Sequence, residues 1–308
     1  MARVLSTVEG THEAHAFGPA DWVLFAVPPL IWGFSFLFIA VGLEHFAPSV
    51  VTAGRIALGA LALGVLPASR RFIPAREWPR ILFVSATWMA IPFTCFSIAE
   101  QWISSSLAGM LNGAMPLVAA MVACAMLGRL PTRPQVTGLL IGFAGVVLVM
   151  WPALRDGGSS SVTGVGLVLL AIVCYGLATN VSVPLQQRYG SLAVTFRSQL
   201  GALAMTAPFA LFGIGGSTFG WRSLGAVAAL GAFGTGLAFV ALGALLARVG
   251  AARASVAVYF VPVVAVLAGV FVHGEHVEAV SLVGMALVVG GAVLTGRAGV
   301  RQPTPAER

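Results

Sequence analysis

The chain has 308 residues, of which 58% are hydrophobic and only 9% are charged, and its mean hydropathy is +0.96. Soluble domains carry about 25% charged residues, so this chain has too few charges to cover a water-facing surface. The composition therefore excludes an ordinary soluble protein and indicates a chain whose main solvent is lipid.

All 17 basic residues are arginines, and the calculated isoelectric point is about 10.6. Nucleic-acid-binding proteins gather their basic residues on one exposed stripe, whereas these arginines stand singly or in pairs between apolar runs. We therefore expect no nucleic-acid partner. The three cysteines lie inside apolar segments, so no disulfide framework is predicted.

Ten apolar runs are long enough to cross about 30 Å of hydrocarbon as helices. In chain order they cover residues 22–43, 48–67, 81–99, 104–127, 134–151, 163–185, 191–213, 223–246, 252–272 and 279–296. These runs lack the period-two alternation of a membrane β-barrel. The sequence therefore predicts an all-α integral membrane fold with ten transmembrane helices, embedded in a lipid bilayer.

The arginines also predict the orientation of the chain in the membrane. With a cytoplasmic N-terminus, thirteen arginines fall in cytoplasmic segments and two in outer loops. Positive residues accumulate on the cytoplasmic side of membrane proteins, so both termini are expected there. The polar first residues do not resemble a cleaved signal peptide. We predict a multi-pass protein of the bacterial inner membrane.

An internal repeat divides the apolar part of the chain into two halves. Pro116 and Pro262 are 146 residues apart, and the same offset relates Gly138 to Gly284 and Gly145 to Gly291. Earlier in each half, Arg55-Ile-Ala-Leu-Gly-Ala-Leu matches Arg197-Ser-Gln-Leu-Gly-Ala-Leu at an offset of 142. Each half contains five predicted helices.

Because five is odd, the second half must enter the membrane upside down relative to the first. Two inverted five-helix repeats are an architecture of many secondary transporters, in which the substrate binds near the midplane between the halves. A gene duplication without transport is the alternative. The predicted organisation is a cytoplasmic tail, first repeat, extracytoplasmic loop, second repeat and cytoplasmic tail at residues 1–21, 22–151, 152–162, 163–296 and 297–308.

These repeated residues resemble the drug/metabolite transporter superfamily, in particular its EamA-like ten-helix branch. The resemblance is carried by Trp32-Gly33-Phe-Ser-Phe36, by the two repeated arginines, and by the Ala…Pro…Gly pattern around the two repeated prolines. The family's Leu-Gly-Glu-Arg sequence is Leu127-Gly128-Arg129-Leu130 in the first half, while the second half keeps Gly274-Glu275. The resemblance implies export of amino acids, other small metabolites or amphipathic drugs.

Polar residues inside membrane spans are costly, which makes Arg55 and Arg197 candidates for function. The first interpretation is structural: each arginine snorkels or binds carbonyls of a broken neighbouring helix. The second is that they bind a substrate carboxylate. Their symmetry favours the structural interpretation, because a substrate rarely needs the same contact from both halves.

Several other polar and aromatic residues at mid-membrane depth are candidates for substrate binding, with helix packing as the alternative for each. Trp32 and Trp88 lie too deep to be interfacial anchors and could contact an amphipathic substrate. Asn112 lies one turn before Pro116, whose ring frees a backbone carbonyl. The full set of expected substrate-binding residues is Trp32, Ser35, Trp88, Asn112, Tyr175, Asn180 and Tyr259, with Pro116 and Pro262 as helix breaks.

Glu100 is the candidate for proton or charge coupling, because no acidic residue lies at mid-membrane depth. A solvated helix end is its alternative role. Transport is therefore expected to be facilitated or only weakly coupled to protons.

Metal and enzyme chemistry are not expected. His273 and His276 lie in a loop, His12 and His15 lie in a tail, and a metal site needs converging ligands. No nucleophile–base pair lies at membrane depth, so we expect neither an enzyme nor a cofactor. The Gly138–Gly142 GxxxG pattern predicts close packing of the fifth helix on a neighbour, with homodimerisation as the alternative to a monomer.

The function predicted from these features is export of a small-molecule substrate, amino acids or similar amphipathic compounds, by alternating access. A flippase of lipids or lipid-linked metabolites, or a multidrug exporter, on the same fold is the alternative.

Overall fold

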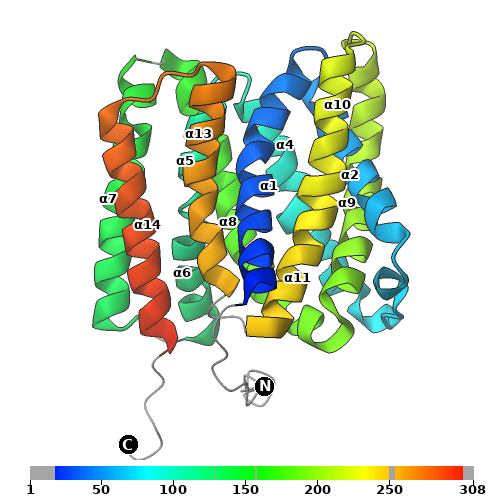
Figure 1. Ribbon diagram of the computed structural model, residues 1–308, viewed down its shortest axis with the longest axis horizontal. Helices are drawn as coiled ribbons and strands as arrows, with labels where there is room; N and C mark the ends of the chain where they lie inside the picture. The colour runs from blue at the N-terminus through cyan, green and yellow to red at the C-terminus, as the bar shows by residue number, and fades with distance from the viewer. Residues whose placement is uncertain (1–17, 129, 157, 250–253, 301–308) are drawn as a thin grey trace, which may run out of the picture.

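The computed structural model describes residues 18–128, 130–156, 158–249 and 254–300, and within these ranges every regular element is a helix. The helices form one bundle, in which α1 begins and α14 ends at the same end (Figure 1). The longer elements in chain order are α1 (Pro19–Leu43), α2 (Pro48–Gly64), α3 (Trp78–Val84), η4 (Ser85–Ala90), α4 (Ile91–Ala99), α5 (Ser105–Asn112), α6 (Met115–Leu127), α7 (Arg133–Asp156), α8 (Gly158–Tyr189), α9 (Ser191–Ile214), α10 (Trp221–Ala229), η5 (Leu230–Leu237), α11 (Ala238–Val249), η6 (Ser255–Phe260), α13 (Val261–His273) and α14 (Ala279–Val300). Two short 3₁₀ turns, η2 (Pro67–Arg70) and η3 (Ala75–Glu77), lie between α2 and α3.

Helices lie in each of the ten predicted ranges, and eight helical segments of the described residues are long and apolar enough to cross a membrane. Helix α2 is apolar but has only 17 residues, and α9 is not among the eight although it has 24 residues. Helix α9 carries Arg197, Gln199 and several hydroxyl side chains, which lower its hydropathy. The all-helical membrane fold is therefore established, and the number of ten crossings stays a prediction.

The predicted boundaries differ from the observed ones mainly between the halves. The loop expected at 152–162 is largely helical, since α7 continues to Asp156 and α8 begins at Gly158. The expected tails are shorter as well, because α1 begins at Pro19 and α14 ends at Val300. Apolar runs mark the lipid-facing length of a helix, and polar residues at the membrane surface can extend the helix by a turn or more.

The third and fourth segments of each half are interrupted. The third segments contain the π-helices η4 and η5, at matching places in the two halves. In the fourth segments, α5 and α6 are separated by Gly113 and Ala114, and 3₁₀-helix η6 precedes α13. Pro116 and Pro262 each lie in the first turn of the helix that follows the interruption, where a missing N–H costs no hydrogen bond.

Glycines bring α7 and α14 into backbone contact. A Cβ atom on Gly138 would lie 2.7 Å from the carbonyl oxygen of Gly291, and one on Gly145 would lie 2.5 Å from that of Gly284. The 146-residue offset relates Gly138 to Gly284 and Gly145 to Gly291. Gly138 therefore contacts the repeat equivalent of Gly145, and Gly145 contacts that of Gly138. The GxxxG pattern at Gly138–Gly142 is thus used for packing within the chain.

Further contacts between the halves are also reciprocal. Gly59 of α2 packs on Thr235 of η5, and its repeat equivalent Gly201 of α9 packs on Ser85 of η4. The second helix of each half therefore contacts the π-helix of the other. This exchange of contacts is the pattern that a two-fold axis between the halves would produce.

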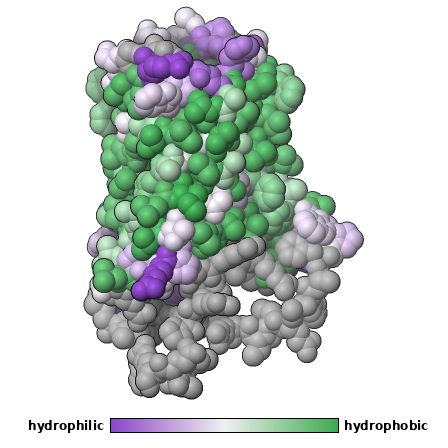
Figure 2. Space-filling view, turned by 90° about the vertical axis from the view of Figure 1, so that its left-hand side faces the viewer, coloured by the Kyte–Doolittle hydropathy of each residue, from purple (hydrophilic) through white to green (hydrophobic). Residues whose placement is uncertain are grey.

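The outer surface of the bundle is apolar between polar ends. Figure 2 shows this on the side formed by α7 and α14, where a broad hydrophobic surface separates hydrophilic residues. Leu140, Val147 and Val283 are more than half exposed there. An apolar surface of this extent, together with the eight long apolar helices, defines a multi-pass membrane protein.

We predict that Gly291→Ala destabilises the protein while Gly290→Ala does not. A Cβ atom on Gly291 would lie 2.5 Å from backbone atoms of α7, whereas one on Gly290 would meet nothing within 4 Å. Overpacking of this kind costs about 1–3 kcal/mol. Thermal unfolding of both variants in detergent measures the difference, and equal melting temperatures would contradict the backbone contact.

Candidate functional site

A cavity of about 280 Å³ lies inside the bundle between the two halves. The first half contributes residues of α1, α2, η4, α4, α5 and α6, and the second half contributes residues of α8, α9, η5, α11, η6 and α13. Its size is close to the lower end of the range for small-molecule sites, about 300 Å³. It is therefore a candidate substrate site shared by both halves.

Aromatic rings form much of the cavity wall. Phe239 contacts both Trp32 and Trp88 edge-to-face, with ring centroids 5.4 and 5.5 Å apart. On another wall, Phe96 lies edge-to-face with Phe36 at 5.4 Å and stacks on Tyr175 at 6.2 Å. Such rings offer a large apolar contact area and can also attract a cation over their faces.

The two π-helices shape this wall. Trp88 projects from η4, and Gly234 belongs to η5. The indole Nε1–H of Trp32 donates a hydrogen bond of 3.0 Å to the Gly234 carbonyl oxygen, which links α1 of the first half to η5 of the second. π-Helical turns widen the helix and change the direction of side chains, and they occur frequently at functional sites.

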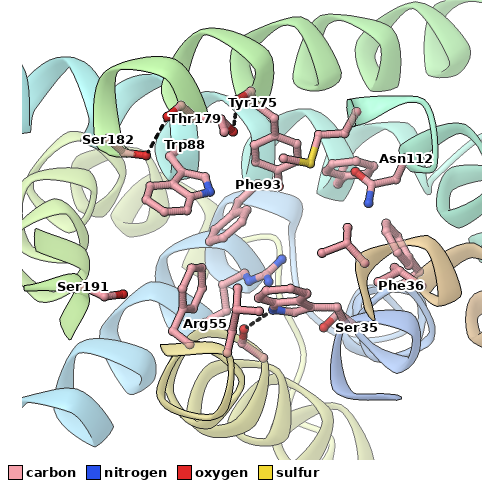
Figure 3. A pocket seen from close by; sticks show the side chains of 18 of the residues that line it. Ser35, Phe36, Arg55, Trp88, Phe93, Asn112, Tyr175, Thr179, Ser182 and Ser191 are labelled. Carbon is pink, nitrogen blue, oxygen red and sulfur yellow. Dashed lines mark hydrogen bonds between the residues drawn. The ribbon is translucent and has the colours of Figure 1, made fainter. Parts of the chain in front are cut away.

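Arg55 is buried at the cavity with 5% of its surface exposed. Its guanidinium carbon lies 3.7 Å from the centroid of the Phe93 ring, and its Nε has no hydrogen-bond partner. Figure 3 shows Arg55 directed into the space between Phe93 and Ser35. A Cβ atom on Gly234 would lie 2.9 Å from Ser35 Oγ and 3.9 Å from Arg55 Nη2, so these two side chains flank the same backbone position.

Asn112 lies at the other side of the cavity, at the last residue of α5 (Figure 3). Its Oδ1 is buried and has no hydrogen-bond partner. The break between α5 and α6 places this amide at a helix end rather than within a continuous helix. Two lining residues thus carry buried atoms without a hydrogen-bond partner: the acceptor Asn112 Oδ1 and the donor Arg55 Nε.

Two of the residues expected to bind substrate, Asn180 and Tyr259, lie outside the cavity. Asn180 donates to the carbonyl oxygens of Ala119 and Gly176, so it joins α8 to α6. The Tyr259 hydroxyl donates to the Ala292 carbonyl oxygen and joins η6 to α14. Neither residue lines the cavity, and both have the packing role that was their alternative.

Arg197, the repeat equivalent of Arg55, has different surroundings from Arg55. Its guanidinium lies 5.4 Å from the ring of its neighbour Phe196, and it does not line the cavity. The expectation that the two arginines share one structural role, drawn from their symmetry, does not match these different surroundings.

Several residues of the cavity carried no signal in the sequence. Phe93 and Phe239 are single phenylalanines in apolar runs, and only the fold brings them beside Arg55 and the tryptophans. Gln186 and Ser191 extend the cavity toward the end of the bundle at which α8 ends and α9 begins (Figure 1). Ser182 also lines the cavity, and its hydroxyl donates to the Thr179 carbonyl oxygen of the preceding turn.

Glu275 binds the first turn of α5. Its carboxylate accepts hydrogen bonds of 2.8, 2.7 and 2.8 Å from Ser105 N, Ser105 Oγ and Ser106 N. Burial disfavours the charged form of Glu275, but these hydrogen bonds outweigh burial and lower the pKa of the carboxyl below its ordinary value. The contact ties the loop after α13 to the start of α5.

Glu100 directly follows α4, and both of its carboxyl oxygens are buried without a hydrogen-bond partner. Burial and the nearby Glu275 carboxylate raise the pKa of Glu100 well above its ordinary value, against the opposing influence of Arg55. The alternative of a solvated charge at a helix end is therefore wrong for Glu100.

No cluster of three metal-ligating side chains is present in the part of the chain that the structure describes. His12 and His15 lie outside that part.

The fold and the cavity define a class: a multi-pass helical membrane protein with a candidate small-molecule site between two halves. Sequence comparison identifies the family, since residues 22–151 and 162–297 each match the EamA-like transporter family. The chain belongs to this family of transporters.

Individual relatives share about a quarter of their residues with this chain over most of its length. A probable terminal-alkyne amino-acid exporter of Streptantibioticus cattleyicolor is 26% identical over 90% of this chain and 93% of its own length. The inner membrane transporter YedA of Escherichia coli K12 is 26% identical over 90% of each chain. An Archaeoglobus fulgidus transporter is 23% identical over 90% of this chain and 98% of its own.

A protein of known crystal structure shares the fold. Its TM-score with this chain is 0.61 at 20% sequence identity, and the match covers 91% of this chain and 99% of the other.

We predict opposite effects on stability for Glu100→Gln and Glu275→Gln. Because the pKa of Glu100 is raised in the folded protein, its carboxyl destabilises the fold as the pH rises above its ordinary pKa near 4.5. Glu100→Gln is therefore expected to raise the thermal midpoint more at pH 8 than at pH 5. The hydrogen bonds to Glu275 favour its charged form, so Glu275→Gln is expected to lower the thermal midpoint at pH 8. The expected loss in the free energy of unfolding is about 1–3 kcal/mol.

Thermal unfolding in detergent from pH 4 to 8 measures both effects, and the Glu275→Gln deficit should shrink below pH 4.5. Glu44→Gln is the control, because Glu44 forms an exposed ion pair with Arg222 that contributes little. If the thermal midpoints of Glu100→Gln and the unmodified protein changed with pH in parallel, this would contradict the burial of an ionisable carboxyl.

Proposed function

We propose that this protein exports small amphipathic metabolites, such as amino acids, across the bacterial inner membrane by alternating access. The observation that carries the proposal is the aromatic cavity between the halves, which combines a large apolar wall with one buried cation and one free amide oxygen. The similarity to an amino-acid exporter supports the substrate class. The similarity to an inner membrane transporter supports the location.

The proposed mechanism uses ten crossings in two inverted repeats. Reciprocal contacts between the halves support this arrangement, as do the π-helices at matching positions. The excess of arginines in the segments assigned to the cytoplasm supports cytoplasmic termini. Rocking of one half against the other about the cavity would expose the substrate to each side in turn.

The two ends of the bundle differ in a way that fits one stage of this cycle. The cavity extends to Gln186 and Ser191 at the proposed cytoplasmic end. The cavity has no such extension at the opposite end, where Glu275 binds the start of α5 and His45 Nδ1 lies 3.1 Å from Ser223 Oγ. A polar contact also joins the halves at the cytoplasmic end, where Arg248 pairs with Asp21. We interpret the structure as a state whose cavity is directed to the cytoplasm and closed toward the outside.

Proton coupling is proposed to involve Glu100. Its buried carboxyl can exchange a proton without losing a hydrogen bond, because it makes none among the described residues. Glu100 lies near Glu275, whose contact with the start of α5 closes the outer end. The charge of Glu100 therefore acts on the residue that makes this contact. Efflux is measured with and without an outward pH gradient. If the gradient changes efflux from the unmodified protein and not from Glu100→Gln, the coupling is assigned to this residue. If efflux from both is independent of the gradient, transport is facilitated.

We predict selective efflux of apolar or aromatic amino acids from proteoliposomes loaded with a mixed pool of amino acids and small metabolites. Mass spectrometry measures which compounds leave. Trp88→Ala removes one aromatic wall and is expected to reduce efflux about 5- to 30-fold, the equivalent of 1–2 kcal/mol of lost contact. Trp221→Ala is the control, because Trp221 is 79% exposed and does not line the cavity.

Equal efflux from Trp88→Ala and Trp221→Ala would contradict the assignment of the cavity. If no compound leaves selectively while labelled lipid analogues cross the same vesicles, the protein is a lipid flippase rather than a metabolite exporter.

A further inference from the structure

Arg55 is a buried cation that forms no ion pair with a described residue; the buried Glu100 carboxyl acts on it only at longer range. It is 95% buried, since only 5% of its surface is exposed, and no described residue forms a hydrogen bond or ion pair with its guanidinium. It is also the single charged residue among the described residues that line the cavity. Burying an unpaired charge is costly, and proteins normally offset that cost with a counter-charge.

The surroundings of Arg55 do not suit a purely structural role. An arginine that stabilises a broken helix would donate to its carbonyl oxygens, and no such bond is present for Arg55. An arginine that snorkels would be partly exposed near a membrane surface. Its repeat counterpart Arg197 is away from the cavity, so the charge at the cavity is a property of the first half alone.

The guanidinium is held in one orientation. It stacks on Phe93 at 3.7 Å, and α2 is fixed against η5 because a Cβ on Gly231 would lie only 2.8 Å from the Arg55 carbonyl oxygen. A guanidinium stacked on a ring keeps its edge free for in-plane hydrogen bonds. That edge matches the two oxygens of a carboxylate, which arginine binds through paired hydrogen bonds.

The rest of the cavity limits what can carry this carboxylate. Its walls are mainly aromatic and aliphatic, and about 280 Å³ accommodates a small molecule. A second anionic group would find no second cation among the described lining residues. The free Oδ1 of Asn112 accepts a hydrogen bond and suits an N–H donor such as an amino group.

We propose that Arg55 is the carboxylate-binding residue of the substrate site, and that the protein takes small monocarboxylates with an apolar or aromatic body. This inference rests on the proposed transport function and names its substrate class. The carboxylate is the required group, and an amino group beside it is accepted through Asn112.

The test is binding to purified protein in detergent, measured by calorimetry with three probes of similar shape: phenylalanine, 3-phenylpropanoate and phenethylamine. The unmodified protein should bind both carboxylates about tenfold or more tightly than phenethylamine, which lacks the carboxylate. Arg55→Gln should lose about tenfold or more in affinity for both carboxylates and lose the discrimination against the amine. Arg197→Gln, the control at the repeat-equivalent position, should bind all three as the unmodified protein does.

Arg55→Lys keeps the charge and loses the paired donors, so it should fall between Arg55→Gln and the unmodified protein. Equal binding of phenethylamine and 3-phenylpropanoate by the unmodified protein would overturn the proposal, even if Arg55→Gln fails to fold. Absence of binding of both carboxylates, or full carboxylate affinity in folded Arg55→Gln, would overturn it as well. Selective efflux of non-carboxylates that depends on Trp88 would leave the transport function standing while this inference fails.

Discussion

Close contact between backbones at glycines is the constraint on which the rest of this structure depends. Lipid offers no hydrophobic drive for helices to associate, so packing and close approach must hold the bundle together. Gly138, Gly145, Gly284 and Gly291 supply that approach between α7 and α14. At Gly59 and Gly201, the second helix of each half approaches side chains of the other half's third segment, Thr235 and Ser85.

These contacts leave the cavity between the halves, and its chemistry follows from what surrounds the bundle. A polar group facing lipid would be costly, so polar side chains turn inward, where they bind carbonyl oxygens or remain free at the cavity. Asn180 and Tyr259 belong to the first kind and fix neighbouring helices. Arg55 and Asn112 belong to the second, and their side chains carry atoms without a hydrogen-bond partner in a mainly apolar cavity.

The fold class and the family follow from the sequence because lipid imposes simple rules on length and hydropathy. The two tryptophans Trp32 and Trp88 also line the cavity, as their depth in the membrane suggests. The different roles of Arg55 and Arg197 could not be predicted, because the repeat makes their local sequences alike and only neighbours from other helices distinguish them. The π-helices could not be predicted either, since hydropathy does not report how a helix is wound. The burial of Glu100 and its proximity to Glu275 could not be predicted either, because Glu275 lies far away along the chain.

The short helix α2 has a consequence for the membrane itself. Its 17 residues span about 26 Å, less than the roughly 30 Å of a typical hydrocarbon layer. Leu61 on this helix is 68% exposed, so part of α2 is directed outward to lipid. A short span is accommodated by local thinning of the bilayer, at a cost that grows with each ångström of mismatch. Because α2 also carries Arg55, the thickness of the surrounding lipid acts directly on the helix that holds the charge of the cavity.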